Sequence, residues 1–239
     1  MAKGTFGQYC PISRAVEVLG ERWSVLIVRD MLCGATRFND IARGLPGISR
    51  SLLAKRLRQL ERAGIVERLD GAYELTEAGE DLRSVVFGLG AWGARWQFGE
   101  PRDDELDPEL LMWWMHDRLD FSVFPDRRIV LEFEFPAQRR RIWIVNDAAG
   151  PSVCTIDPGF EVDVLVRAEL NCLYEVWLGR RELRPALRDG SIELLGQPSL
   201  VRRFPNLLLL SPVAELVASA TAQNADRERA IKLTVATAD

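Results

Sequence analysis

The sequence predicts an α+β protein in two parts: a small helical part that ends in a β-hairpin, and a larger part with a mainly antiparallel sheet and helices. Three observations predict this. Residues 37–64 carry two helical patterns around a turn, an Asp-Gly pair joins two alternating segments within residues 65–77, and residues 129–135 alternate with period two. With 239 residues, of which 47% are hydrophobic, the chain is large enough for two cores.

The most informative element is a basic helix predicted over residues 50–63. Ser49 is a suitable N-cap, because its hydroxyl can accept a hydrogen bond from the first helical turn, and Gly64 is suited to a left-handed C-terminal stop. Leu53, Leu57 and Leu60 recur at four- and three-residue spacing. This spacing predicts one buried face, and the opposite face carries cations.

A shorter helix over residues 38–43 and a turn over residues 44–47 precede this basic helix, and two alternating strands around Asp70 and Gly71 follow it. Asp-Gly is the strongest short signal for a hairpin. Helix, turn, basic helix and hairpin in this order indicate a winged helix-turn-helix domain that binds double-stranded DNA. For the basic helix taken alone, a solvated amphipathic helix is the alternative.

The predicted DNA contacts are the residues on the exposed face of the basic helix, together with flanking cations. Cations, a serine hydroxyl and a small apolar side chain suit a helix that lies in a major groove. The candidates are Arg37, Ser49, Arg50, Ser51, Ala54, Lys55, Arg56, Arg58 and Arg68. Among them, Arg56 flanks the exposed face and is expected to contact phosphate.

The distribution of charge fits this prediction. The whole chain has 31 Lys and Arg against 35 Asp and Glu, a formal net charge of −4. Residues 1–99 have 14 basic against 11 acidic residues, whereas the rest of the chain has 17 against 24. Because phosphate binding depends on the local field, a basic face on an acidic protein remains workable.

A long apolar helix is predicted after the hairpin, over residues 77–98, with a capping-box-like start at Thr76. Phe87, Trp92 and Trp96 give this helix more apolar surface than one small domain needs. We therefore expect it to form a homodimer together with the N-terminal helix.

Residues 100–108 are acidic and contain two prolines, which predicts a linker between one domain at residues 1–99 and another at residues 109–215. The second domain begins with a helix rich in large apolar residues and ends with two helices and a strand. Further strands are predicted at residues 129–135, 140–146, 151–156 and 161–168. Residues 216–239 are weakly patterned and predict a loose helix or a frayed tail.

The N-terminal residues resemble a known family. Cys10-Pro11, Trp23 within GERW, RFNDI at residues 37–41 and LTEAG at residues 75–79 look like the HxlR-type winged-helix regulators, which are relatives of the MarR group. The resemblance implies a dimeric bacterial transcription factor, expected to be a repressor that reads a palindromic operator. One departure is a shorter wing than that family has, which leaves Arg68 as its only cation.

Residues 161–205 resemble the sterol carrier protein type 2-like domains, with an alternating strand, a helix ending in WLG, a second helix ending in DG and a further strand. The resemblance implies a lipid-like or other apolar small-molecule ligand in a tunnel between sheet and helices. The candidate ligand residues, mostly adaptable or bulky groups, are Met112, Trp113, Met115, His116, Phe133, Phe135 and Trp177. An ordinary core is the alternative for these residues.

Cys10 is a candidate for redox or electrophile sensing, a role that an N-terminal cysteine has in some relatives of this family. Pro11 at a first helical position places the thiol near a helix N-terminus, which favours the thiolate. Ordinary packing of a small apolar residue is one alternative. In the sensing interpretation, the second domain serves as a protein-interaction module.

Catalysis, metals and cofactors are not expected. His116 is the only histidine, and the four cysteines lack metal-type spacing or a CxxC pair. No GxSxG, HExxH, P-loop or dinucleotide motif is present. No signal peptide precedes Gln8 and no apolar run has the length of a membrane span, so the expected location is the cytoplasm.

Overall fold

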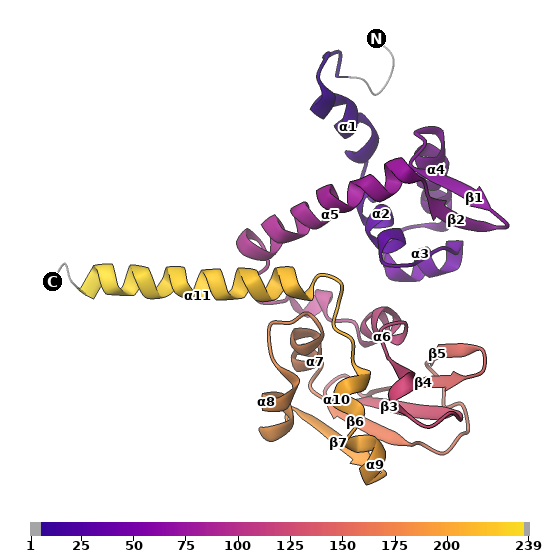
Figure 1. Ribbon diagram of the computed structural model, residues 1–239, viewed down its shortest axis with the longest axis vertical. Coiled ribbons are helices and arrows are strands. Elements are labelled where there is room, and N and C mark those ends of the chain that lie inside the picture. The colour runs from indigo at the N-terminus through magenta and orange to yellow at the C-terminus, as the bar shows by residue number, and fades with distance from the viewer. Residues whose placement is uncertain (1–5, 237–239) are drawn as a thin grey trace. The chain divides into compact units, whose positions relative to one another are not determined.

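The computed structural model describes residues 6–236, and the chain forms two compact units, residues 1–89 and 90–239 (Figure 1). The boundary expected at residue 99 lies near the end of the long helix α5, whereas the compact units meet within that helix. No helix in the described part of the chain is both long and apolar enough to cross a membrane.

The first unit consists of helices and one small hairpin. Its elements are α1 (Pro11–Leu19), α2 (Ser24–Leu32), α3 (Phe38–Gly44), α4 (Arg50–Arg62), β1 (Val66–Leu69), β2 (Ala72–Leu75) and the start of α5 (Glu77–Trp96). The order confirms the predicted winged helix-turn-helix. Its core contains Ile27 and Val28 from α2 and Ile41 from α3, all fully buried.

Local chemistry sets the ends of α4 as expected from the sequence. The Ser49 hydroxyl accepts a hydrogen bond from the backbone N–H of Leu52 at 3.2 Å. Gly64, at φ +72°, follows the helix in the left-handed conformation that glycine adopts without strain. Leu53 and Leu57 are fully buried, which confirms that the predicted leucine face packs against the core.

The hairpin forms a short wing. β1 and β2 are antiparallel, and Asp70 and Gly71 between them have φ +48° and +82°. Positive φ at both central residues matches the right-handed twist of the strands. The backbone N–H of Tyr73 donates to the carbonyl of Thr36 at 2.7 Å, which ties the wing to the segment before α3.

The second unit contains a five-stranded sheet and several helices. The elements are the end of α5, η1 (Asp103–Glu105), α6 (Pro108–His116), η2 (Phe121–Val123), β3 (Ile129–Phe135), β4 (Arg140–Asp147), β5 (Gly150–Cys154), β6 (Val164–Ala168), α7 (Leu170–Trp177), α8 (Leu183–Arg188), β7 (Ile192–Gly196), α9 (Pro198–Val201), α10 (Phe204–Leu207) and α11 (Ala214–Ala236). The strand order is β5-β4-β3-β6-β7, and only the β3–β6 pair is parallel. The prediction of a mainly antiparallel sheet is confirmed.

One face of this sheet packs against helices α6, α7 and α10 (Figure 1). Phe133 and Phe135 of β3 and Phe204 of α10 are almost completely buried in that layer. Alternation along β3 sends Glu132 and Glu134 to the other face. There, Glu134 accepts a hydrogen bond from Arg167 of β6 at 2.7 Å.

Two element boundaries differ from the sequence-based expectation. Pro108, expected at the end of the linker, is the first residue of α6, because the Asp107 carboxylate accepts hydrogen bonds from the first-turn N–H groups of Glu109 and Leu110. Of the two alternatives predicted for the tail, a helix is present: α11 begins at Ala214, before the expected residue 216, and its first turns are buried at Ala214 and Val217. Residues 237–239 of that predicted tail lie outside the described residues.

Candidate nucleic-acid interface

The side of α4 opposite its leucines is exposed. Ser51, Lys55 and Arg58 are exposed to solvent, and Ala54 is half-buried between them. Spacings of three and four residues place these side chains on one face of the helix. An α-helix with polar and cationic side chains on its exposed face can enter a major groove.

Arg50 lies at the N-terminal end of the same face. Its guanidinium donates to the Asn39 side-chain oxygen at 2.8 Å and lies 5.1 Å from the centre of the Phe38 ring. Both partners belong to α3, so Arg50 joins the two helices of the motif while its side chain stays exposed. These contacts restrict the Arg50 side chain before DNA binds. The side chain would therefore lose less conformational entropy on contact with a base.

The remaining candidates surround this face. Ser49 uses its hydroxyl for the helix cap, and that oxygen lies 3.2 Å from the Ser51 hydroxyl. Arg37 is exposed at the N-cap position of α3. Arg68 in the wing lies over the Tyr73 ring at 5.6 Å and is exposed.

The expected phosphate contact of Arg56 is not supported by the structure. Its side chain is buried, and its guanidinium binds the Arg22 carbonyl, the Gln59 amide oxygen and the Glu21 carboxylate. An arginine buried with three protein partners is not available to a phosphate. The leucine spacing contained this signal, because position 56 is three residues after Leu53 and therefore lies beside the buried face.

Asp30 is a second buried charge that sequence reasoning did not identify. Only 8% of it is exposed, and Oδ1 accepts a hydrogen bond from the Arg29 guanidinium at 2.8 Å. Oδ2 accepts no hydrogen bond from the described residues. Burial raises the pKa of this carboxyl group to about 6, although Arg29 partly opposes the shift.

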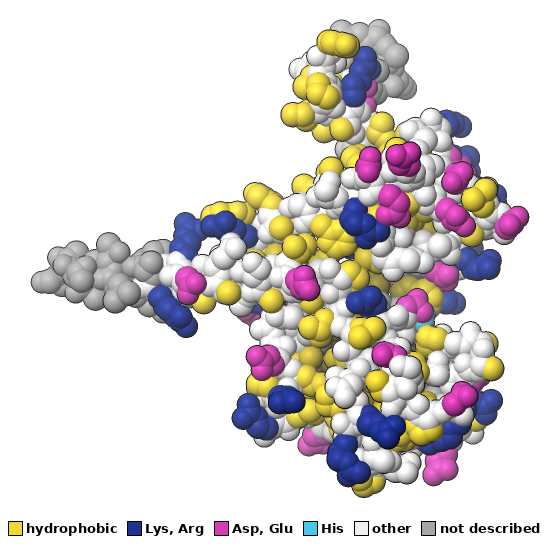
Figure 2. All heavy atoms as spheres, viewed as in Figure 1, with side chains coloured by type: hydrophobic (Ala, Val, Ile, Leu, Met, Phe, Trp, Pro, Cys, Tyr) yellow, Lys and Arg dark blue, Asp and Glu magenta, His cyan; other side chains and the backbone are white. Residues whose placement is uncertain are grey.

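Apolar side chains lie exposed on α1 and along the part of α5 in the first unit (Figure 2). Ile12 and Val16 on α1 are 73% and 43% exposed, and Val85 and Leu89 on α5 are 48% and 53% exposed. Large apolar side chains rarely cluster on a surface that remains in water. The two faces are therefore candidates for contact with another protein surface.

Cys10 is the N-cap residue of α1 and is partly exposed. The backbone N–H groups of Ser13 and Ile12, in the first turn of α1, lower the pKa of its thiol. Its surroundings therefore favour the thiolate, which is the reactive form of a cysteine.

The candidate ligand residues of the second unit lie mainly inside its core. Five of them are almost completely buried there, namely Met112, Met115, Phe133, Phe135 and Trp177. Trp113 is half-buried and stacks on His116 at 4.4 Å, and the His116 Nδ1–H donates to the Trp113 carbonyl. This burial is typical of an ordinary core, although the buried indole N–H of Trp177 has no hydrogen-bond partner among the described residues. A ligand tunnel at this position stays a prediction.

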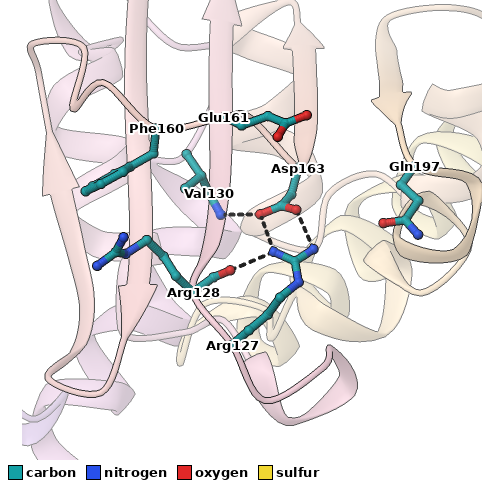
Figure 3. A pocket seen from close by; sticks show the side chains of 7 residues that line it. All are labelled: Arg127, Arg128, Val130, Phe160, Glu161, Asp163 and Gln197. Atoms are coloured by element: carbon teal, nitrogen blue, oxygen red, sulfur yellow. Dashed lines mark hydrogen bonds and ion pairs between the residues drawn. The ribbon is translucent and has the colours of Figure 1, made fainter.

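A pocket of about 390 Å³ lies elsewhere in the second unit, at the start of β3 and β6 (Figure 3). Two of its polar groups are paired with each other, because Arg127 forms two hydrogen bonds with the Asp163 carboxylate, at 2.6 and 3.2 Å. On the other side, the Arg128 guanidinium lies 4.1 Å from the centre of the Phe160 ring. Such a polar pocket differs in chemistry from the apolar tunnel expected from the sequence.

The fold and the exposed cationic helix together define the class of winged helix-turn-helix transcriptional regulators. A family model described as HxlR-like helix-turn-helix matches residues 18–100. The HTH-type transcriptional regulator YodB of Bacillus subtilis is 38% identical over 108 residues, which cover 42% of this chain and 95% of YodB. The chain belongs to the HxlR family.

Some relatives match this chain over a smaller share of their length. An uncharacterized HTH-type transcriptional regulator of Mycobacterium tuberculosis is 42% identical over 89 residues, 34% of this chain. The chain spans only 56% of the length of that relative. The family model ends at residue 100, so most of the second unit lies outside it.

Solved structures similar to part of this chain include two regulators. The structure of quinone-bound YodB from Bacillus subtilis has 41% sequence identity and a TM-score of 0.34, and covers 35% of this chain and 97% of YodB. The redox regulator HypR in its reduced form has 33% identity and a TM-score of 0.33, and covers 35% of this chain and 90% of HypR.

Proposed function

We propose that this protein is a DNA-binding transcriptional regulator that recognises a palindromic operator as a homodimer. The observation that supports the proposal most strongly is the exposed face of α4, where Lys55 and Arg58 stand free of the protein core. In a helix-turn-helix protein the second helix of the motif enters the major groove. Each protomer would place its α4 in one half-site.

The proposed contacts divide by chemistry. Exposed cations bind phosphates or guanine edges, hydroxyls donate to or accept from either, and Ala54 offers a small apolar contact to a thymine methyl group. The proposed set is Arg37, Ser49, Arg50, Ser51, Ala54, Lys55, Arg58 and Arg68. Arg56 is excluded because it is buried.

Dimer formation would use the exposed apolar faces of α1 and α5. Full burial of a Val, Leu or Ile side chain contributes about 1.5–3 kcal/mol, and Ile12, Val16, Val85 and Leu89, which are 43–73% exposed, would each supply part of that amount from each protomer. A twofold dimer also accounts for a palindromic operator, because each half-site then meets the same surface.

The proposal also includes repression and control by an apolar ligand. A repressor acts by occupying its operator. A ligand in the second unit would release the protein from the operator if it bound the DNA-free conformation more tightly than the DNA-bound one. The resemblance of residues 161–205 to sterol carrier protein type 2-like domains supports this part. Native mass spectrometry of the freshly purified protein tests it: a bound lipid-like mass supports a ligand site, and an empty chain contradicts it.

Selection from a library of random DNA duplexes tests the proposed function itself. The full-length protein should enrich an inverted repeat whose half-site centres lie about 10 base pairs, or a multiple of that, apart. Enrichment of no sequence over several rounds would contradict operator recognition. Enrichment of an unrepeated site would retain DNA binding and contradict the dimer.

A second candidate function is redox or electrophile sensing through Cys10. The lowered pKa of this partly exposed thiol favours it. Benzoquinone should then weaken binding of the selected duplex by the wild-type protein, and Cys10→Ser should abolish that response while it leaves untreated binding unchanged. An identical quinone response in the variant would contradict the sensing role.

A further inference from the structure

Arg56 lies on the predicted DNA-reading helix but faces the protein. It is 7% exposed, whereas Lys55 and Arg58 on the same helix are exposed. A buried guanidinium is stable only when its charge and its N–H groups find partners in the fold. The identity of those partners therefore indicates what this arginine holds together.

Two of its three partners belong to the segment between α1 and α2. The Nε–H of Arg56 donates to the Arg22 carbonyl at 3.0 Å, and Nη2 lies 2.5 Å from the Glu21 carboxylate. The third partner, Gln59 on α4 itself, accepts from Nη1 at 2.7 Å. Because a guanidinium is a rigid planar fork, these bonds fix α4 relative to that segment in direction as well as in distance.

The same segment also reaches the turn of the helix-turn-helix motif. Trp23 has φ +82°, a left-handed backbone conformation that a tryptophan adopts only when its surroundings hold it. Its indole ring lies beside Gly47 in the turn before α4, 3.9 Å from the position that a Cβ atom would take there. Residues 21–23, which we term the α1–α2 junction, thus contact both the turn and α4.

We propose that Arg56 is a positioning residue that locks α4 to the α1–α2 junction. The junction then sets the direction in which α4 presents Lys55 and Arg58 to DNA. A displacement of α1 reaches α4 through the same bonds, since α1 ends at Leu19, two residues before Glu21. This inference rests on the proposed DNA-binding function, and it assigns to Arg56 a role without any contact to DNA.

Glu21→Gln in the full-length protein is the first test, because the Glu21 side chain is 51% exposed and its substitution leaves the core intact. Glu61→Gln on α4 is the matched control: it removes the same charge from a residue outside the α1–α2 junction. Each variant removes one negative charge that repels the DNA phosphates, so this effect alone would make both variants bind DNA more tightly. The proposed lock predicts the opposite for Glu21→Gln alone, because a neutral amide oxygen accepts from the Arg56 guanidinium more weakly than a carboxylate does, with affinity for the selected inverted repeat about tenfold lower.

Arg56→Lys is the second test, and it applies also if Glu21→Gln loses its folded circular dichroism spectrum. A lysine keeps the charge but cannot bind the Arg22 carbonyl and the Glu21 carboxylate as a fork. Affinity for the selected repeat should fall about tenfold, although the number of cations and therefore the salt dependence of binding stay at the wild-type value. Wild-type affinity in a folded Arg56→Lys variant would show that a cation alone is sufficient at this position, as it is for a phosphate contact, and would overturn the inference.

The outcomes separate the inference from the function on which it rests. If the wild-type protein prefers no duplex over a scrambled one, the DNA-binding function itself is wrong. If the wild-type protein prefers the repeat, and Glu21→Gln binds it as tightly as Glu61→Gln does, the function stands and the positioning role of Arg56 is wrong.

Discussion

Lys55→Ala should weaken DNA binding and make the affinity less dependent on salt concentration. Five of the proposed contact residues are exposed cations: Arg37, Arg50, Lys55, Arg58 and Arg68. A dimer thus offers at most ten, and if each one neutralises a phosphate, log affinity falls with log salt at a slope of about −9. The substitution removes two of the ten, so the slope should move toward zero by about 1.8.

Fluorescence anisotropy with a labelled duplex measures this slope directly. Between 50 and 200 mM salt the wild-type protein should lose about tenfold more affinity than Lys55→Ala does. Arg202→Ala is the matched control, because it removes an exposed cation from the second unit. Equal slopes for Lys55→Ala and the wild type would refute the phosphate contact, and a reduced slope for Arg202→Ala would place DNA on a different surface.

Three further predictions concern the stability of the first unit, measured by urea denaturation. Burial raises the pKa of Asp30 in the folded protein to about 6, above its ordinary value. The wild type therefore loses stability as pH rises from 4 to 7, and the stability of Asp30→Asn relative to the wild type should rise by about 2 kcal/mol over that range. Parallel pH profiles of the two proteins would contradict the shift. Leu57→Ala leaves a cavity at a fully buried position and should lower the free energy of unfolding by about 2–5 kcal/mol. A decrease below about 1 kcal/mol would contradict this prediction and show that neighbouring side chains fill the cavity. Gly79→Ala should cost about 1–3 kcal/mol, because a Cβ atom there would lie 2.3 Å from the Ile65 carbonyl oxygen. Gly88→Ala is the control: a Cβ atom there would have nothing within 4 Å, so the substitution should stabilise the helix by up to about 1 kcal/mol. Equal effects of the two substitutions would contradict the close approach at Gly79.

The elements of the first unit could be predicted because each has a local chemical cause. The cap at Ser49, the left-handed stop at Gly64 and the Asp70-Gly71 hairpin act within a few residues of the chain, and all three are present in the structure. Strand β3 was equally predictable, since its apolar side chains alternate with Glu132 and Glu134.

The role of Arg56 could not be predicted with the same ease, because its partners Glu21 and Arg22 are more than thirty residues away in the sequence. A cation beside a row of leucines suits either a phosphate or a carboxylate of the same protein, and only the fold decides between them. The buried charge of Asp30 has the same origin: its burial depends on how α2 packs, which local patterns do not specify.

The second unit was predicted less completely for a related reason. Residues such as Met112 and Phe133 have side chains that suit both a core and an apolar ligand site, and composition does not separate the two. The parallel pairing of β3 with β6 also escaped prediction, because it brings together strands that are about thirty residues apart, and strand alternation is the same in parallel and antiparallel pairs.

Protection of guanines from dimethyl sulfate tests the central claim, that α4 lies in the major groove, most directly. The reagent methylates guanine N7, which lies in the major groove. A duplex that contains the selected repeat should show protected guanines in two segments about 10 base pairs apart when the wild-type protein is bound. Undiminished methylation of every guanine in a fully bound duplex would contradict the claim and place the protein outside the major groove.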